Sequence, residues 1–246
     1  MSNAKRFYLH GLPGSPAELD YALPHWRKKR VVPLNRLSLH STYEGALKRM
    51  MDDLSEEEAV HLIGFSFGGM SALKLAASLP NRVKQLDLIA PAAPLNLGDF
   101  LDQMAGKPIF EAAMKGRLGA IAGGQAMMVR ISIGSVIKAM FATAPQADRA
   151  LLCDKAMQTM LRDGLRSCLL KHLPQYKDEL RAYVQPWAHT LDDIKCPVKI
   201  WHGTSDTWAP LGLSQALSEA LGPLCEIEQM ESLGHYSALK EALPNI

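Results

Sequence analysis

Short apolar or β-branched runs recur along the chain, and stretches with apolar residues at helical spacing separate most of them. The runs that we expect to form strands are 6–9, 30–33, 60–63, 86–90, 198–201 and 225–228. Strands that alternate with helices are typical of a mostly parallel sheet with helices on its faces. The pattern therefore predicts an α/β fold with a small, mostly parallel sheet of about six strands.

Two of the predicted helices begin with a capping signal. Ser15, Pro16 and Glu18 provide a capping serine, a proline at the first helical position and a glutamate at the third. Ser41 and Glu44 repeat the capping-box spacing without the proline. Both signals predict defined ends for the loops that precede these helices.

The segment 91–197 interrupts the alternation of strands and helices. It lacks convincing strands, is rich in alanine, leucine and methionine, and contains two glycines at 123–124. We expect a helical insertion at 95–194 in a core formed by 1–94 and 195–246, as one structural domain with a lid. A helical cap over the carboxyl ends of the strands would exclude water and shape an apolar pocket. Ordinary helical packing without a role in recognition is the alternative.

Composition excludes several classes of function. At 246 residues and 48% hydrophobic content, the chain can bury one large core. No stretch approaches the ~20 consecutive apolar residues of a membrane span, and the N-terminus has no signal-peptide core, so we expect a cytoplasmic protein without a membrane partner. The net charge of +2 gives no argument for nucleic acid. We expect no cofactor, no metal and free thiols at Cys153, Cys168, Cys196 and Cys225.

The segment 61–70 reads His-Leu-Ile-Gly-Phe-Ser-Phe-Gly-Gly-Met and places Ser66 in a Gly-x-Ser-x-Gly pattern. A serine hydroxyl is a weak nucleophile, so an enzyme holds it on a tight strand-to-helix turn beside a base and backbone N–H donors. Gly64 and Gly68 remove the side chains that would crowd such a turn. The pattern is short enough to be only a packing turn, but the strand before it and the helix after it favour a nucleophile.

A serine nucleophile needs a histidine base and usually a carboxylate that orients it. Asp206 lies in the loop after the predicted strand 198–201, and His235 follows a glycine in the loop after the last predicted strand. Taken singly, such residues are more often turn or surface residues. The order Ser66, Asp206, His235 is the order that follows a nucleophile elbow. We therefore predict Ser66 as the nucleophile, Asp206 as the orienting acid and His235 as the base.

Several motifs in this order resemble the α/β-hydrolase family over nearly the whole chain. They are His-Gly-Leu-Pro-Gly-Ser at 10–15, Gly-Phe-Ser-Phe-Gly-Gly at 64–69, Leu-Pro-Asn-Arg-Val at 79–83, His-Gly-Thr-Ser-Asp at 202–206 and Gly-His at 234–235. The first is similar to the family's His-Gly oxyanion loop. The resemblance implies that the backbone N–H groups of Leu12 and Phe67 form an oxyanion hole. We also expect Leu12, Phe67 and Trp208 to line the substrate site.

The resemblance implies a serine hydrolase, carboxylesterase-like, that cleaves a small or medium acyl ester through an acyl-enzyme. Serine rather than aspartate at the nucleophile position argues against dehalogenase or epoxide-hydrolase chemistry. One alternative is the same triad used for carbon–carbon bond hydrolysis, elimination or release of an N-terminal proline. A second alternative is a non-catalytic or slow ligand receptor. The chain departs from the family in lacking the usual N-terminal hairpin and the glycine-rich loop, which 34–39 replaces.

Two features of the insertion bear on the substrate. Its methionines could line an acyl-chain pocket, although most are expected in the core: Met104, Met114, Met127, Met128, Met140, Met157 and Met160. Basic residues outnumber the single acid Glu111 between 107 and 138: Lys107, Lys115, Arg117, Arg130 and Lys138. A solvated face explains this charge most simply. The alternative is attraction of an anionic substrate or an acidic acyl-carrier protein, as in carrier-protein methyl esterases that share this architecture.

Overall fold

The computed structural model describes residues 4–37 and 42–246 and contains one six-stranded sheet in the order β2-β1-β3-β4-β5-β6. Every pair of neighbouring strands is parallel, which confirms the predicted sheet. The strands are β1 (Lys5–Leu9), β2 (Val31–Leu34), β3 (Val60–Phe65), β4 (Val83–Ile89), β5 (Val198–Gly203) and β6 (Cys225–Met230). β3 is buried along its whole length, as expected for a central strand covered on both faces.

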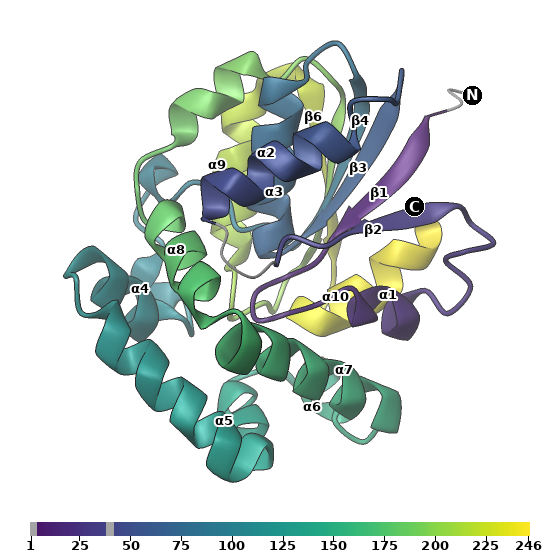
Figure 1. Cartoon of the computed structure of the whole chain (residues 1–246). Helices are drawn as coiled ribbons and strands as arrows, with labels where there is room; N and C mark the ends of the chain where they lie inside the picture. Colours follow the sequence, from purple (N-terminus) through teal and green to yellow (C-terminus); the bar gives the residue numbers. More distant parts are fainter. Residues whose placement is uncertain (1–3, 38–41) are drawn as a thin grey trace.

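Helices cover both faces of the sheet (Figure 1). Three of them lie over one face: α2 (Tyr43–Asp53), α3 (Phe67–Ser78) and α9 (Leu211–Leu221). The other face carries α1 (Ala17–Ala22) and α10 (His235–Ala242). Parallel strands and crossover helices bring all six carboxyl ends to one edge of the sheet, which is where ligands bind in such folds.

The chain between β4 and β5 is helical and contains no strand, and all of its residues are described. Its α-helices gather at one end of the molecule (Figure 1). They are α4 (Lys107–Met114), α5 (Leu118–Met140), α6 (Gln146–Leu151), α7 (Lys155–Arg166) and α8 (Leu173–Tyr183), and the predicted boundaries 95–194 enclose them. We call this group of helices the cap.

Helix α5 is long and apolar enough, by length and composition alone, to cross a membrane. Its most apolar window has a mean hydropathy of 1.4 and only 22% of that window is buried. The sequence suggested no span of this length, because Arg130 and Lys138 interrupt the apolar run. The helix packs against α4, α7 and α8, so it is an integral part of the cap.

The first predicted capping box is wrong. Helix α1 begins at Ala17, whose N–H donates to Ser15 Oγ at 3.3 Å. The Glu18 carboxylate does not return to the cap, because it accepts the Tyr8 hydroxyl at 2.7 Å and the Gly11 N–H at 3.0 Å. A buried tertiary partner therefore replaces the local one.

The second predicted helix start lies one residue later than expected. Thr42 is the N-cap of α2, and its hydroxyl accepts the Gly45 N–H at 3.0 Å. Ser41, the predicted capping residue, lies outside the described residues. Threonine and serine both cap a helix through a side-chain hydroxyl oxygen. The capping-box spacing therefore predicted the helix but not its first residue.

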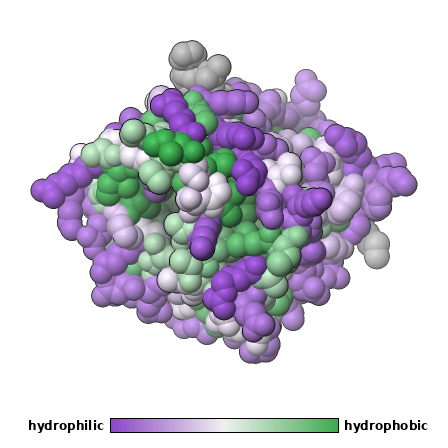
Figure 2. Space-filling model, turned by 90° about the horizontal axis from the view of Figure 1, so that it is seen from below, coloured by the Kyte–Doolittle hydropathy of each residue, from purple (hydrophilic) through white to green (hydrophobic). Residues whose placement is uncertain are grey.

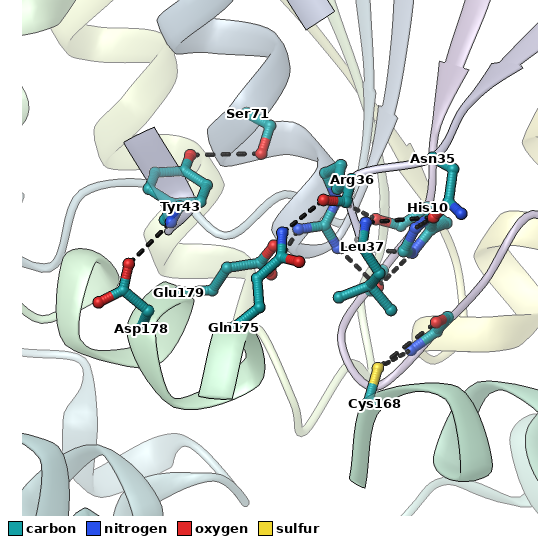
Figure 3. Close-up of polar contacts among 12 residues, drawn as sticks. His10, Asn35, Arg36, Leu37, Tyr43, Ser71, Cys168, Gln175, Asp178 and Glu179 are labelled. Atoms are coloured by element: carbon teal, nitrogen blue, oxygen red, sulfur yellow. Dashed lines mark hydrogen bonds and ion pairs between the residues drawn. The ribbon is translucent and has the colours of Figure 1, made fainter. Parts of the chain in front are cut away.

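A buried ion pair joins the sheet to the cap (Figure 3). Arg36, which follows β2, lies 2.5 Å from Glu179 of α8 through its Nη1 atom, and both side chains are fully buried. The same guanidinium donates to the carbonyl oxygens of His10 at 3.1 Å and Gly11 at 2.8 Å. The Gln175 amide of α8 donates to the Arg36 carbonyl oxygen. The cap is thereby tied to the loop that follows β1.

Removing one partner of this pair should destabilise the protein strongly. Glu179→Gln leaves the Arg36 charge buried without its carboxylate, so we expect a loss of about 3–5 kcal/mol in the free energy of unfolding. Urea unfolding followed by circular dichroism measures this loss. Glu111→Gln, which removes a solvent-accessible partner of Lys107 and Lys115, is the matched control and should change the midpoint little. Equal midpoints for Glu179→Gln and the control would contradict a stabilising buried pair.

Candidate active site

Ser66 occupies the turn between β3 and α3 with a backbone φ of 53° and ψ of −122°. A positive φ is rare for a residue with a Cβ and is typical of a strained functional turn. The turn is held on both sides, because the Ser66 N–H donates to Ile89 at 3.0 Å and its carbonyl oxygen accepts from Ala92 at 2.9 Å. The side chain is buried in the protein but lines a cavity.

The glycines on either side of Ser66 are required by close backbone approach. A Cβ at Gly64 would lie 2.7 Å from the Gly68 carbonyl oxygen. A Cβ at Gly68 would collide with the Leu9 carbonyl at the end of β1. Neither position has room for a side chain. The two glycines of the sequence pattern therefore reflect the packing of α3 against β1 and β3.

His235 and Asp206 lie beside this turn and form a buried pair. His235 is the first residue of α10, and its Nδ1 atom lies 2.6 Å from Asp206 Oδ2. The other Asp206 oxygen accepts the N–H groups of Trp208 at 2.7 Å and Ala209 at 3.0 Å. Both hydrogen bonds fix the carboxylate in the loop after β5. Ser66 and His235 line the same cavity. Within the described part of the chain, Ser66 Oγ and His235 Nε2 form no hydrogen bond with each other or with another group, whereas His235 Nδ1 is paired with Asp206.

The contact between His235 and Asp206 shifts the pKa of both residues. Burial lowers the pKa of His235, but the charge and hydrogen bond of Asp206 outweigh burial and hold this pKa above its usual value. Burial raises the pKa of Asp206, but the charge and hydrogen bond of His235 outweigh it and hold the pKa below its usual value. Asp206 therefore stays ionised, and His235 is a stronger base than a free histidine.

A second histidine, His202, lies near the same carboxylate but has a different environment. It is buried at the end of β5, with Nε2 2.8 Å from the Ala209 carbonyl oxygen and Nδ1 2.7 Å from Ser214 Oγ. Burial lowers its pKa despite the nearby Asp206 charge. His202 is therefore a neutral histidine that supports the Asp206 loop.

The backbone N–H groups of Leu12 and Phe67, which were predicted to form the oxyanion hole, have no hydrogen-bond partner among the described residues. Phe67 is the first residue of α3, so its N–H has no carbonyl partner within the helix and lies at the positive end of the helix dipole. Leu12 follows β1, and no described residue accepts its N–H. Both residues line the cavity together with Ser66. Gly11 packs directly beside the elbow, because a Cβ on it would lie 3.3 Å from Ser66 Cβ.

Glu18 supports the loop that carries Leu12. Its carboxylate accepts the Gly11 N–H and the Tyr8 hydroxyl, and burial raises the pKa of Glu18 to about 7. The sequence pattern around Glu18 predicted a helix cap rather than this contact. The only local signal was the Ser-x-x-Glu spacing, and that spacing indicated the wrong partner.

Asp148 of α6 holds the start of the helix that carries His235. Its Oδ2 atom accepts the His235 N–H at 2.8 Å, and its Oδ1 atom accepts the Ser237 N–H at 2.8 Å and hydroxyl at 2.6 Å. The Ser237 hydroxyl in turn accepts the Gly234 N–H at 2.7 Å. An acid from the cap therefore fills the place of an N-cap for α10. Nothing in the sequence around Asp148 indicated this role.

The cavity has a volume of about 290 Å³ and a mostly apolar wall. Leu12, Phe67 and Trp208, which the sequence placed at a substrate site, all line it. Trp208 also stacks on the His235 ring, with 5.3 Å between ring centroids. Among the predicted methionines, Met104 and Met140 line the cavity, Met157 and Met160 are buried, and the exposed ones are Met114, Met127 and Met128.

The residues that the structure describes contain no group of three or more side chains suited to hold a metal ion. The polar side chains that line the cavity are Ser66, His235, Gln125, Tyr176, Tyr183 and Trp208. Of these, the Ser66 hydroxyl and the His235 imidazole lie beside the backbone N–H groups of Leu12 and Phe67. This set can remove a proton from Ser66 and stabilise a developing negative charge.

The fold matches known proteins. The family model described as "Alpha/beta hydrolase family" matches residues 7–242. No curated protein matches the sequence. Many solved structures match the fold, among them three enzymes from bacteria.

The crystal structure of a bromoperoxidase from Bacillus anthracis matches with a TM-score of 0.66 and 17% identity, over 98% of this chain and 88% of that one. An enol-lactonase from Burkholderia xenovorans LB400 matches with a TM-score of 0.66 and 18% identity, over 98% and 88%. A thermophilic esterase from Thermogutta terrifontis, with malate bound, matches with a TM-score of 0.67 and 14% identity, over 99% and 87%. At these identities the likeness concerns the fold alone.

The family match extends from within β1 to the last residue of α10 and thus includes the elbow and all six strands. The resemblance inferred from the motifs is confirmed by this match. The protein belongs to the α/β-hydrolase family.

Proposed function

We propose that the protein is a serine hydrolase that cleaves a small or medium acyl ester through an acyl-enzyme. The observation that carries this proposal is the 2.6 Å contact between His235 and Asp206, beside Ser66 on the wall of a shared cavity. A buried, ionised carboxylate on Nδ1 leaves Nε2 of the imidazole as the basic atom. The strained turn at Ser66 supports a functional rather than a packing role for the elbow.

In the proposed reaction, His235 Nε2 removes the Ser66 hydroxyl proton and Ser66 Oγ attacks the ester carbonyl carbon. The N–H groups of Leu12 and Phe67 donate to the resulting oxyanion. His235 gives its proton to the leaving alkoxide, and the acyl group remains on Ser66. Water then loses a proton to His235, attacks the acyl-enzyme and releases the acid, while Asp206 stays ionised throughout.

The composition of the cavity wall favours a substrate with an uncharged acyl group. No lysine, arginine, aspartate or glutamate lines the cavity among the described residues. Release of an N-terminal proline requires a carboxylate that binds the substrate amine, and elimination from an anionic substrate requires a cation that binds the anion. The uncharged wall of the cavity favours neither reaction. The cavity volume of about 290 Å³ lies near the lower end of the roughly 300–1,000 Å³ usual for ligand pockets, which accords with a small or medium ester.

Ser66→Ala should abolish covalent labelling by a fluorophosphonate and lower the turnover of p-nitrophenyl esters by a factor on the order of 10⁴ to 10⁶. The reason is that no other group can form the acyl-enzyme. Ser78→Ala, on the exposed end of the same helix, is the control and should retain both activities. Labelling or turnover of Ser66→Ala at the native level would refute the proposal.

The pH profile of kcat/KM should have an acid limb above pH 6.5, the ordinary value for histidine, because Asp206 raises the pKa of His235. Activity falls as pH drops through this raised pKa, since protonated His235 cannot accept the Ser66 proton. Asp206→Asn removes the charge, so the limb should move to lower pH while kcat falls by about 10⁴. A limb that stays in place in Asp206→Asn would contradict the pairing.

Asp148 should act as a positioning residue. Asp148→Asn replaces an acceptor oxygen with a donor opposite the N–H groups at the start of α10, so the His235 ring should shift from its place. We expect kcat to fall by roughly 100-fold with KM little changed, because a displacement of about 1 Å can cost this much. The acid limb should also move to lower pH, because the Asp148 charge helps to raise the pKa of His235.

Asp154→Asn provides the matched control for Asp148→Asn. Asp154 caps α7 by accepting the Ala156 N–H at 2.8 Å, is part of the same cap and is solvent-accessible. Asparagine caps a helix about as well as aspartate, so Asp154→Asn should change stability little and leave kcat and the pH profile unaltered. A native pH profile and kcat in Asp148→Asn, or equal effects in both variants, would show that Asp148 is only structural.

A further inference from the structure

The large apolar side chains that the described structure exposes are concentrated on the cap. Five of the six lie on α4 and α5, and the sixth is Leu224. Ile131 is 66% exposed and Met127 is 61% exposed, which is unusual for side chains of this kind. The five are Met114, Ile121, Met127, Met128 and Ile131.

Helix α5 is kinked at Ser132, and the part before the kink has an apolar side against the protein and a second apolar side toward solvent. Ala122, Ala126 and Val129 are buried and share one side. Ile121, Met128 and Ile131 are exposed, at spacings that place them together on the opposite side. Figure 2 views the molecule from the end where α5 lies in Figure 1, and hydrophobic side chains gather on this face.

Positive charge without an acid on the same helix accompanies this exposed side. The sequence has no aspartate or glutamate between Glu111 and Asp148. Arg117, Arg130 and Lys138 are exposed and, among the described residues, form no ion pair. Lys107 and Lys115 differ, because acidic side chains pair with both. We define the α5 patch as Ile121, Met127, Met128 and Ile131 with the cations Arg117, Arg130 and Lys138.

The α5 patch is continuous with the cavity that contains Ser66. Ile121 belongs to both, since it is exposed and also lines the cavity. Gln125, one helical turn further along α5, lines the cavity as well. A surface bound to the patch would therefore lie directly at the cavity's rim.

We propose that the α5 patch binds the surface of an anionic lipid bilayer. Exposed methionine and isoleucine side chains flanked by unpaired cations match an apolar interface beneath negative headgroups. A second copy of this chain fits less well, because a two-fold interface brings the patch against itself and sets its cations against one another without an acid in α5. The packing of α5 against α4, α7 and α8 keeps it on the surface rather than across the bilayer.

If the proposed hydrolase activity also holds, the docked protein would draw an amphiphilic ester from the bilayer into the cavity past Ile121. This consequence rests on the proposed function, whereas lipid binding does not. Binding is measured without turnover, so failure of one proposal is distinguishable from failure of the other.

Flotation of the full chain with vesicles tests the proposal. Vesicles of phosphatidylcholine alone are compared with vesicles in which phosphatidylserine makes up about one third of the lipid. The native protein should float with the anionic vesicles at least tenfold more strongly, and salt should weaken this difference. The double variant Met128→Ser and Ile131→Ser should lose roughly tenfold or more in partition coefficient on both vesicles. The double variant Arg130→Gln and Lys138→Gln should lose about fivefold per cation, on anionic vesicles only.

Leu224→Ser is the matched control, because it removes an exposed apolar side chain far from α5 in sequence. It should float like the native protein. All variants should retain turnover of a water-soluble p-nitrophenyl ester, which shows that they are folded. Absence of vesicle binding, or binding that the α5 variants leave unchanged, would overturn the proposal. A native dimer in light scattering that Met128→Ser and Ile131→Ser convert to monomers would overturn it too, because a second copy would then cover the patch.

Discussion

The packing of helix α3 directly against the ends of β1 and β3 is the constraint on which the rest of the site depends. Gly68 meets the Leu9 carbonyl so closely that no side chain fits between them, and the backbone of Ser66, two residues earlier, has a positive φ. The same contact brings Gly11 beside Ser66. The start of α3 and the loop after β1 therefore border one cavity, and their free N–H groups belong to the same site.

The cap stabilises this site from the opposite side through buried polar contacts. Glu179 pairs with Arg36 behind the loop after β1, and Asp148 accepts the backbone N–H groups around His235. Cys168 contributes a weaker contact, since its sulfur accepts the Gly14 N–H at 3.4 Å. Each contact joins the helical segment between β4 and β5, directly or through Arg36, to the loop after β1 or to the start of α10, both of which border the cavity. Movement of the cap would therefore disturb the site itself as well as access to it.

The sheet could be predicted from the sequence, and so could the proximity of Ser66, Asp206 and His235. Each of the three follows a strand, and the carboxyl ends of parallel strands lie at the same edge of the sheet. It did not predict the contacts of Glu18 and Asp148. Asp148 lies 87 residues from His235, and an acid within a helical segment carries no local sign of so distant a partner. The solvent-facing apolar side of α5 was also missed, because apolar residues on both sides of a helix do not indicate which side is covered.

If the proposed function is right, Ser66 carries the acyl group during turnover. The most direct test is mass spectrometry of the protein quenched with acid while it turns over a p-nitrophenyl ester, followed by digestion and peptide sequencing. The peptide containing Ser66 should gain the mass of the acyl group, and this gain should disappear when deacylation is complete. An acyl group found on another residue, or turnover with no acylated peptide under conditions that trap a known acyl-enzyme, would contradict the proposed function.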